Sequence, residues 1–224
     1  EPYIVGGHTA CGFWVDTDRA TTISGLFAAG DAAGGCPQKY VTGALAEGEI
    51  AALSALRYIS ENAPTPIPEA EIKAHISETE SFLGEDKSVY SAEQLEEAMQ
   101  TAMDAYAGGI KTNYRFNEKQ LDIADMKIRR IEKLSDTLHA DDFQELMYIY
   151  ELRERLTVCR SVIAHLKARH ETRWHCFAEN LDYPEKDDRN WRKYVNSRLE
   201  NGEIKIILRE LTEEGQRVYE HSHK

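Results

Sequence analysis

Two long amphipathic stretches joined by a very short connection most strongly constrain the fold of this 224-residue chain. The first begins at Asn117, a good helix N-cap residue, and Gln120 three positions later completes a capping box. Apolar side chains then recur at helical spacing: Leu121, Ala124, Ile128, Ile131, Leu134 and Leu138. The second stretch, 141–171, carries a similar stripe: Ile149, Leu152, Leu156, Cys159, Ile163 and Leu166. Because only a short turn separates the stretches, we predict two antiparallel helices within a helical bundle.

Composition divides the chain into four segments, which we predict as separate parts. Residues 1–62 are rich in Gly and Ala, with short strands expected at 3–5, 13–15 and 25–28 and a helix at 43–61. Residues 63–104 contain three alternating prolines, which form a linker, and then an acidic helical region with a break at 84–88.

The bundle occupies 105–180, and the tail at 181–224 contains a hairpin turn at Asn201-Gly202 before a strand at 205–208. The predicted fold class is therefore mainly α with a small α/β part at the start, a helical bundle, and a short α+β tail.

Charge and composition exclude several classes of protein. The net charge of −12 argues against a general nucleic-acid binder, which needs a basic face. No stretch approaches the apolar length of a membrane span, and no secretion leader precedes the first residues, so we expect a cytoplasmic protein. The four cysteines, Cys11, Cys36, Cys159 and Cys176, form no CxxC pair, and we predict no metal site.

Residues 25–52 read GLFAAGDAAGGCPQKYVTGALAEGEIAA, in which Asp31 stands among glycines and alanines. We predict a short buried strand ending at Gly30, where the backbone bends or approaches another group closely. Asp31 then lies at the carboxyl end of that strand, where its carboxylate can accept hydrogen bonds from sugar-like hydroxyls. Small residues at 43–46 begin a helix whose first N–H groups favour partial negative charge. The alternative is a tightly packed turn in which Asp31 is only a surface cap.

This stretch resembles the second flavin-binding motif of the succinate dehydrogenase/fumarate reductase flavoprotein family. The later segments ELRERLTVCRSVIAHLKARHETRW and DYPEKDDRNW resemble the C-terminal helical domain of the same family, so the resemblance covers most of the chain outside about 63–104. It implies that residues 1–62 are the C-terminal piece of an FAD-binding domain. It also implies that Asp31, after Gly30, contacts the ribityl hydroxyls of FAD. The isoalloxazine ring would face the backbone of Gly43, Ala44, Leu45 and Ala46.

One departure indicates a branch of the family. Succinate- and fumarate-converting members carry HGANRLGG before the helix, and its arginine grips a substrate carboxylate, whereas Val41 stands at about that position here. The segment Cys36–Ala52 instead looks like the adenylylsulfate reductase branch, as do YIVGGH and YAGGIKTNYRFNEKQL. Members of that branch reduce adenylylsulfate to AMP and sulfite by two-electron transfer through FAD. A succinate- or fumarate-type enzyme, or a module that mainly docks a partner subunit, are the alternatives.

The resemblance also suggests two substrate contacts. His8 follows two glycines and matches an active-site histidine beside the flavin, although a lone histidine near a glycine turn can be purely structural. Lys39 is a candidate contact for a small anionic substrate, with a solvated loop lysine as the alternative.

No GxGxxG unit for the FAD pyrophosphate is present in the sequence. We therefore expect the chain to be the C-terminal portion of a larger subunit, which by itself binds no FAD. We expect electrons to come from an iron–sulfur partner subunit, because the cysteine sets that hold such clusters are not found here.

Overall fold

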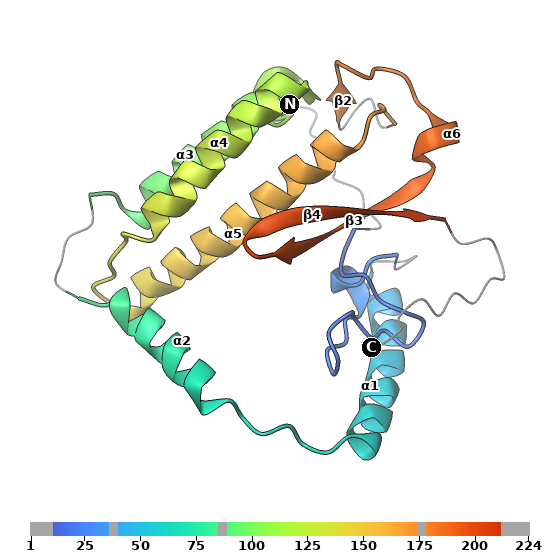
Figure 1. Cartoon of the computed structure of the whole chain (residues 1–224), viewed down its shortest axis with the longest axis vertical. Helices are drawn as coiled ribbons and strands as arrows, with labels where there is room; N and C mark the ends of the chain where they lie inside the picture. The colour runs from blue at the N-terminus through green and yellow to red at the C-terminus, as the bar shows by residue number, and fades with distance from the viewer. Residues whose placement is uncertain (1–10, 36–39, 85–88, 174–177, 212–224) are drawn as a thin grey trace. The chain divides into compact units, whose positions relative to one another are not determined.

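The computed structural model describes residues 11–35, 40–84, 89–173 and 178–211. The chain divides into two compact units, one running up to Ile67 and the other covering Pro68–Leu211. Helices dominate the second unit, the first unit combines a loop region with one long helix, and the β-structure is confined to short pieces and one hairpin (Figure 1). The predicted fold class, mainly α with a small α/β part and an α+β tail, is confirmed.

The first unit is a loop region folded against one helix, α1 (Val41–Glu61). The loop ends in a single turn of 3₁₀ helix, η1 (Gly30–Ala32). The ring of Tyr58 meets that of Phe27 edge-on at 6.3 Å, and its hydroxyl lies 3.0 Å from that of Ser24. The helix predicted at 43–61 is confirmed, and it begins two residues earlier.

The strands predicted at 13–15 and 25–28 are wrong. These segments form only isolated single-residue bridges: Phe13 with Ala33, Val15 with Thr21, and Ala20 with Phe27. A strand needs a continuous ladder of partners, and the described residues supply one partner at a time. The strand predicted at 3–5 lies outside the described residues.

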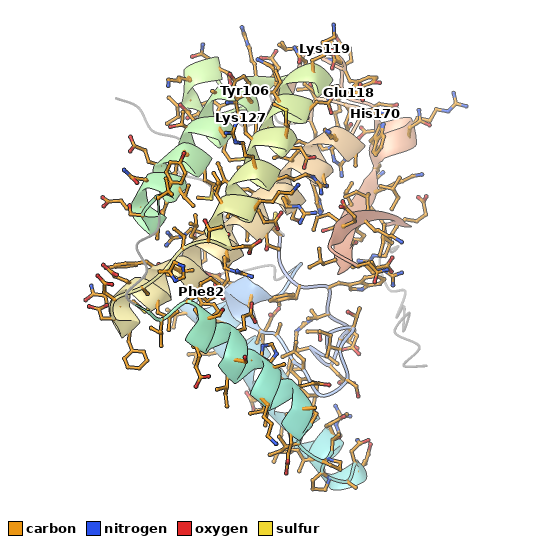
Figure 2. All side chains as sticks on the ribbon, turned by 60° about the vertical axis from the view of Figure 1, so that its left-hand side comes forward. Phe82, Tyr106, Glu118, Lys119, Lys127 and His170 are labelled. Atoms are coloured by element: carbon orange, nitrogen blue, oxygen red, sulfur yellow. The ribbon has the colours of Figure 1, made fainter. Side chains whose placement is uncertain are left out.

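The second unit is a helical bundle with a hairpin. Its long helices are α2 (Glu69–Ser81), α3 (Ala92–Tyr106), α4 (Glu118–Ser135) and α5 (Phe143–Ala168). Figure 1 shows α3, α4 and α5 side by side. In Figure 2 the labelled Lys127 of α4 and Tyr106 of α3 lie close together, with the ammonium 5.5 Å from the ring centroid.

Ion pairs between α4 and α5 give the direction of packing. Arg160 pairs with Glu132 at 3.0 Å, and Lys167, further along α5, pairs with Asp122, earlier in α4. Residue numbers rise in one helix as they fall in the other, so the predicted antiparallel packing is confirmed.

The core of the bundle consists of the two predicted stripes together with residues from α3. Its fully buried side chains include Leu121, Ala124, Ile128, Leu152, Leu156 and Ile163. The predicted capping box at Asn117 and Gln120 is present in both directions, and Ser91 and Gln94 form a second one that begins α3. Helix α5 begins after the N-cap residue Asp142, whose carboxylate accepts hydrogen bonds from the N–H groups of Gln144 and Glu145, so all three packed helices begin at a side-chain cap.

Short elements complete the unit: η2 (Ile110–Thr112), β1 (Arg115–Phe116), β2 (Glu179–Asn180) and α6 (Asp188–Trp191). Strands β1 and β2 pair in parallel, and β3 (Lys193–Glu200) pairs antiparallel with β4 (Glu203–Glu210). Asn201 and Gly202 between the hairpin strands both have positive φ, 50° and 79°, as a two-residue type I′ turn requires. The predicted hairpin turn is confirmed.

Candidate functional site

In the first unit, the turn η1 lies directly against the first turn of α1. Gly30 is buried with φ +64°, and a Cβ built on it would lie 3.0 Å from the Cβ of Ala44. Both the backbone conformation and the close approach therefore require glycine at this position. This contact brings Asp31, which is exposed, beside the start of the helix.

The start of α1 is open to solvent. Its N-cap residue, Tyr40, makes no side-chain capping hydrogen bond, and the first intrahelical bond runs from the Ala44 N–H to the Tyr40 carbonyl at 2.9 Å. Two large aliphatic side chains at this helix start face solvent: Val41 is 76% exposed and Leu45 is 71% exposed. The first N–H groups of such a helix attract acceptor atoms and partial negative charge.

One supporting residue was missed by the sequence analysis. Glu47, one turn further along α1, is only 5% exposed, and its Oε2 accepts a 3.0 Å hydrogen bond from the Gly30 N–H. Its other oxygen lies 3.6 Å from Nε of Arg19. The available signal was an acidic residue in a helix start otherwise built of small residues.

The structure thus brings together six of the predicted site residues: Gly30, Asp31, Gly43, Ala44, Leu45 and Ala46. Chemically, an exposed carboxylate beside an uncapped helix start offers acceptors for hydroxyl groups and donors for carbonyl oxygens. These are the two kinds of contact that the resemblance assigns to the flavin. The buried strand predicted before Asp31 is wrong: Phe27 forms only a single-residue bridge with Ala20, and the 3₁₀ turn follows at Gly30–Ala32.

The remaining predicted residues, His8 and Lys39, lie outside the described residues. Within 11–35, 40–84, 89–173 and 178–211, no group of His, Cys, Asp or Glu has the arrangement of a metal site. None of the helices in the described part of the chain combines the length and apolar character that a bilayer crossing requires.

The second unit has a buried charged cluster around Glu171, whose side chain is fully buried. Its carboxylate accepts hydrogen bonds from Arg169 at 2.6 Å and from Arg173 at 2.8 and 2.9 Å, and the Asp187 N–H donates at 2.9 Å. Burial acts to raise the pKa of Glu171, but the bonds from Arg173, Asp187 and Arg169 together lower it below its ordinary value. The cluster connects residues 169–188 within the second unit.

A family model described as the C-terminal part of fumarate reductase flavoproteins matches residues 96–220, more than half of the chain. The chain belongs to this family. In this chain, the matched residues include most of α3, then α4, α5 and the β3–β4 hairpin.

Individual relatives agree with this assignment. The alpha subunit of adenylylsulfate reductase from Megalodesulfovibrio gigas is 26% identical over an alignment of 235 residues, gaps included. The alignment covers 89% of this chain and 35% of that protein. The structure of adenylylsulfate reductase from Archaeoglobus fulgidus matches at 32% identity and a TM-score of 0.81, over 87% of this chain and 33% of that chain. The resemblance to the adenylylsulfate reductase branch is therefore confirmed.

Another member of the flavoprotein family shares the fold at lower identity. A quinol fumarate reductase from E. coli matches at 18% identity and a TM-score of 0.76, over 89% of this chain and 36% of that chain. The chain spans about a third of the length of all these relatives.

Proposed function

We propose that this chain is the C-terminal third of an FAD-dependent oxidoreductase subunit that reduces adenylylsulfate to AMP and sulfite. The bound FAD would supply two-electron transfer. The described residues would supply part of its binding site, at the junction of η1 and α1. Within this proposal, 1–62 complete an FAD-binding domain, 63–104 connect it to the bundle and contribute most of α3 to that bundle, 105–180 form the rest of the bundle and 181–224 form the tail.

The contact between Gly30 and Ala44 is the observation that carries the FAD part of the proposal. It holds the Asp31 turn against an exposed, uncapped helix start, so that one acceptor and several donors lie next to each other. Asp31 would accept hydrogen bonds from the ribityl hydroxyls. The backbone of 43–46 would face the isoalloxazine ring, with the Gly43 N–H, which precedes the first intrahelical bond at Ala44, as the donor to a carbonyl oxygen. Leu45 would lose its solvent exposure against the cofactor or the domain that carries it.

Two observations support adenylylsulfate over a C4-dicarboxylate as substrate. Identity to adenylylsulfate reductase is 32%, against 18% for the E. coli fumarate reductase. Val41 also stands at about the position of the arginine that grips a substrate carboxylate in fumarate- and succinate-converting enzymes. An apolar residue there removes a charge-assisted contact, worth about 1.5–3 kcal/mol.

His8 and Lys39 complete the proposed site from outside the described residues. We assign His8 a place beside the substrate, where it stabilises charge that develops during reduction. Lys39 would bind the small anionic substrate. An iron–sulfur partner subunit would deliver the electrons.

The decisive experiment uses the purified full-length subunit with its electron-transfer partner, assayed with adenylylsulfate and, separately, with fumarate. We expect AMP and sulfite to form and fumarate reduction to stay at background. His8→Ala should lower adenylylsulfate turnover by about 10²–10³ while FAD content is unchanged. His75→Ala, on the exposed surface of α2, is the matched control. Rapid fumarate reduction without AMP formation would instead favour the fumarate reductase alternative.

A further inference from the structure

Glu47 connects three segments of the first unit: the helix α1, the turn η1 and the loop that contains Arg19. It belongs to α1, it accepts the Gly30 N–H of η1 at 3.0 Å, and it forms an ion pair with Arg19 of the preceding loop at 3.6 Å. Both the Glu47 side chain and the Gly30 backbone are buried. The carboxylate is therefore the point at which the loop, the turn and the helix are connected.

Arg19 is itself held in a fixed position. It has a positive φ of 65°, rare for a residue with a side chain, and both its N–H and its guanidinium donate to the Asp16 carbonyl at 3.1 Å. Its Nε is buried and makes no hydrogen bond among the described residues, but it forms an ion pair with Glu47 at 3.6 Å. A buried carboxylate is costly unless it is paired and hydrogen-bonded, and here it has both kinds of partner.

The buried Gly30 N–H requires a hydrogen-bond acceptor, and Glu47 supplies it. A buried backbone donor without an acceptor is unfavourable, and in this turn the acceptor is a side chain rather than the backbone. Gly30 immediately precedes Asp31, so this hydrogen bond holds the turn on the helix side of Asp31, while the Phe13 N–H holds the Ala32 carbonyl on its other side at 2.8 Å. Ala44 leaves no room for a side chain at Gly30, since a Cβ built there would lie 3.0 Å from the Ala44 Cβ.

We propose that Glu47 is a positioning residue for the cofactor site: its hydrogen bond to the Gly30 N–H fixes the turn that presents Asp31 to FAD. The inference rests on the proposed function. Glu47 acts through the turn and touches no cofactor atom. Fixing the turn in advance means that FAD binding does not have to order it, which strengthens binding.

Substitutions at Glu47 distinguish the effect of the side-chain length, which places the acceptor oxygen near Gly30, from the effect of the negative charge. Glu47→Gln keeps an acceptor oxygen at the same reach but loses the charge opposite Arg19. Glu47→Asp keeps the charge but withdraws the carboxylate from Gly30 by one methylene. In the full-length subunit we expect Glu47→Asp and Glu47→Ala to raise the Kd for FAD by about 10-fold or more, and Glu47→Gln by less than about 3-fold. Glu49→Ala, an exposed glutamate two residues away, should leave the Kd unchanged.

A second measurement needs no cofactor. In the chain itself, the Gly30 amide should exchange with deuterium slowly in the wild type and in Glu47→Gln, and at least 10-fold faster in Glu47→Asp. If Glu47→Ala does not fold, the Gln and Asp variants still give the comparison. Equal Kd values for the Gln and Asp variants would overturn the positioning role.

Asp31→Ala distinguishes this inference from the proposed function. If Asp31→Ala weakens FAD binding and Glu47→Asp does not, only the positioning role is wrong. If Asp31→Ala binds FAD with wild-type affinity, the proposed cofactor site itself is wrong.

Discussion

At the scale of single residues, buried carboxylates organise both units, and each is surrounded by donors. Glu171 accepts four hydrogen bonds, three from two arginines and one from the backbone at Asp187. Arg173 continues the network to Asp188 at 2.7 Å. Removing one partner from a buried, fully bonded charge cluster leaves the others buried and unpaired, which is strongly destabilising.

We expect Glu171→Gln to lower the free energy of unfolding of the bundle by about 2–4 kcal/mol at pH 7. Because the folded pKa of Glu171 is below its ordinary value of 4.5, its stabilisation is present above that pH and lost as the pH falls through the folded pKa. The difference between wild type and variant should therefore shrink as the pH is lowered from about 5 to below 4.5. Urea unfolding followed by far-UV circular dichroism measures it, with Glu154→Gln on the exposed side of α5 as the control. A difference that stays constant over this range would contradict the role of the ionised carboxylate.

Residues at the candidate site were predictable in different degrees. Gly30 and Asp31 were found because glycines next to a lone carboxylate form a local pattern. Glu47 and Arg19 were not found, because their pairing joins positions 28 residues apart through a loop whose path the sequence does not encode locally. The predicted strand before Asp31 failed for a related reason: a strand depends on neighbours, and the composition of 25–28 does not specify them.

At the scale of elements, the hairpin is attached to α5 by polar contacts. Arg160, only 6% exposed, donates to the Gly202 carbonyl at the hairpin turn and to Glu132 of α4. One turn further along α5, His165 Nε2 lies 2.9 Å from the Ser197 hydroxyl of β3. Burial, and secondarily the charge of Arg169, lowers the pKa of His165, so the neutral ring is favoured in this contact.

The helices and the hairpin turn followed from the sequence because caps, stripes and an Asn-Gly turn are local signals. The attachment of the hairpin did not, since an arginine and a histidine on a long helix look like ordinary surface residues. Only the fold brings Arg160 under the Gly202 carbonyl.

Arg160→Met should detach the hairpin while leaving the bundle folded. The variant keeps the aliphatic length of the side chain but leaves Glu132 and the Gly202 carbonyl without their donor, so we expect a loss of about 2–4 kcal/mol. Hydrogen–deuterium exchange should accelerate in β3 and β4 and change little in α3. Arg130→Met, at an exposed position of α4, is the matched control. Unchanged exchange in the hairpin would show that apolar packing alone holds it.

At the scale of the whole molecule, the two units differ in how much apolar surface they bury. In α1 the buried residues are Glu47 and Ser54, whereas Leu53, Leu56 and Ile59 are more than half exposed. The apolar stripes of α4 and α5 pack against each other and against α3 within the second unit. For this reason, sequence periodicity alone predicted the bundle. The apolar face of α1 has no such partner among the described residues, and under the proposed function the rest of the FAD-binding domain covers it.

This difference predicts where the stability of the chain lies. The piece Pro68–Leu211, produced alone, should unfold cooperatively at nearly the same temperature as the main transition of the whole chain, because its core is internal to it. Leu152→Ala, at a fully buried position, should lower the free energy of unfolding by about 2–5 kcal/mol, whereas Leu56→Ala, at a 64% exposed position of α1, should change it little.

The chain alone should emerge from gel filtration without bound FAD, as measured by absorbance near 450 nm, whereas the full-length subunit retains it. Recovery of stoichiometric FAD with the chain alone would mean that the η1–α1 junction holds the cofactor without the remaining two thirds of the protein.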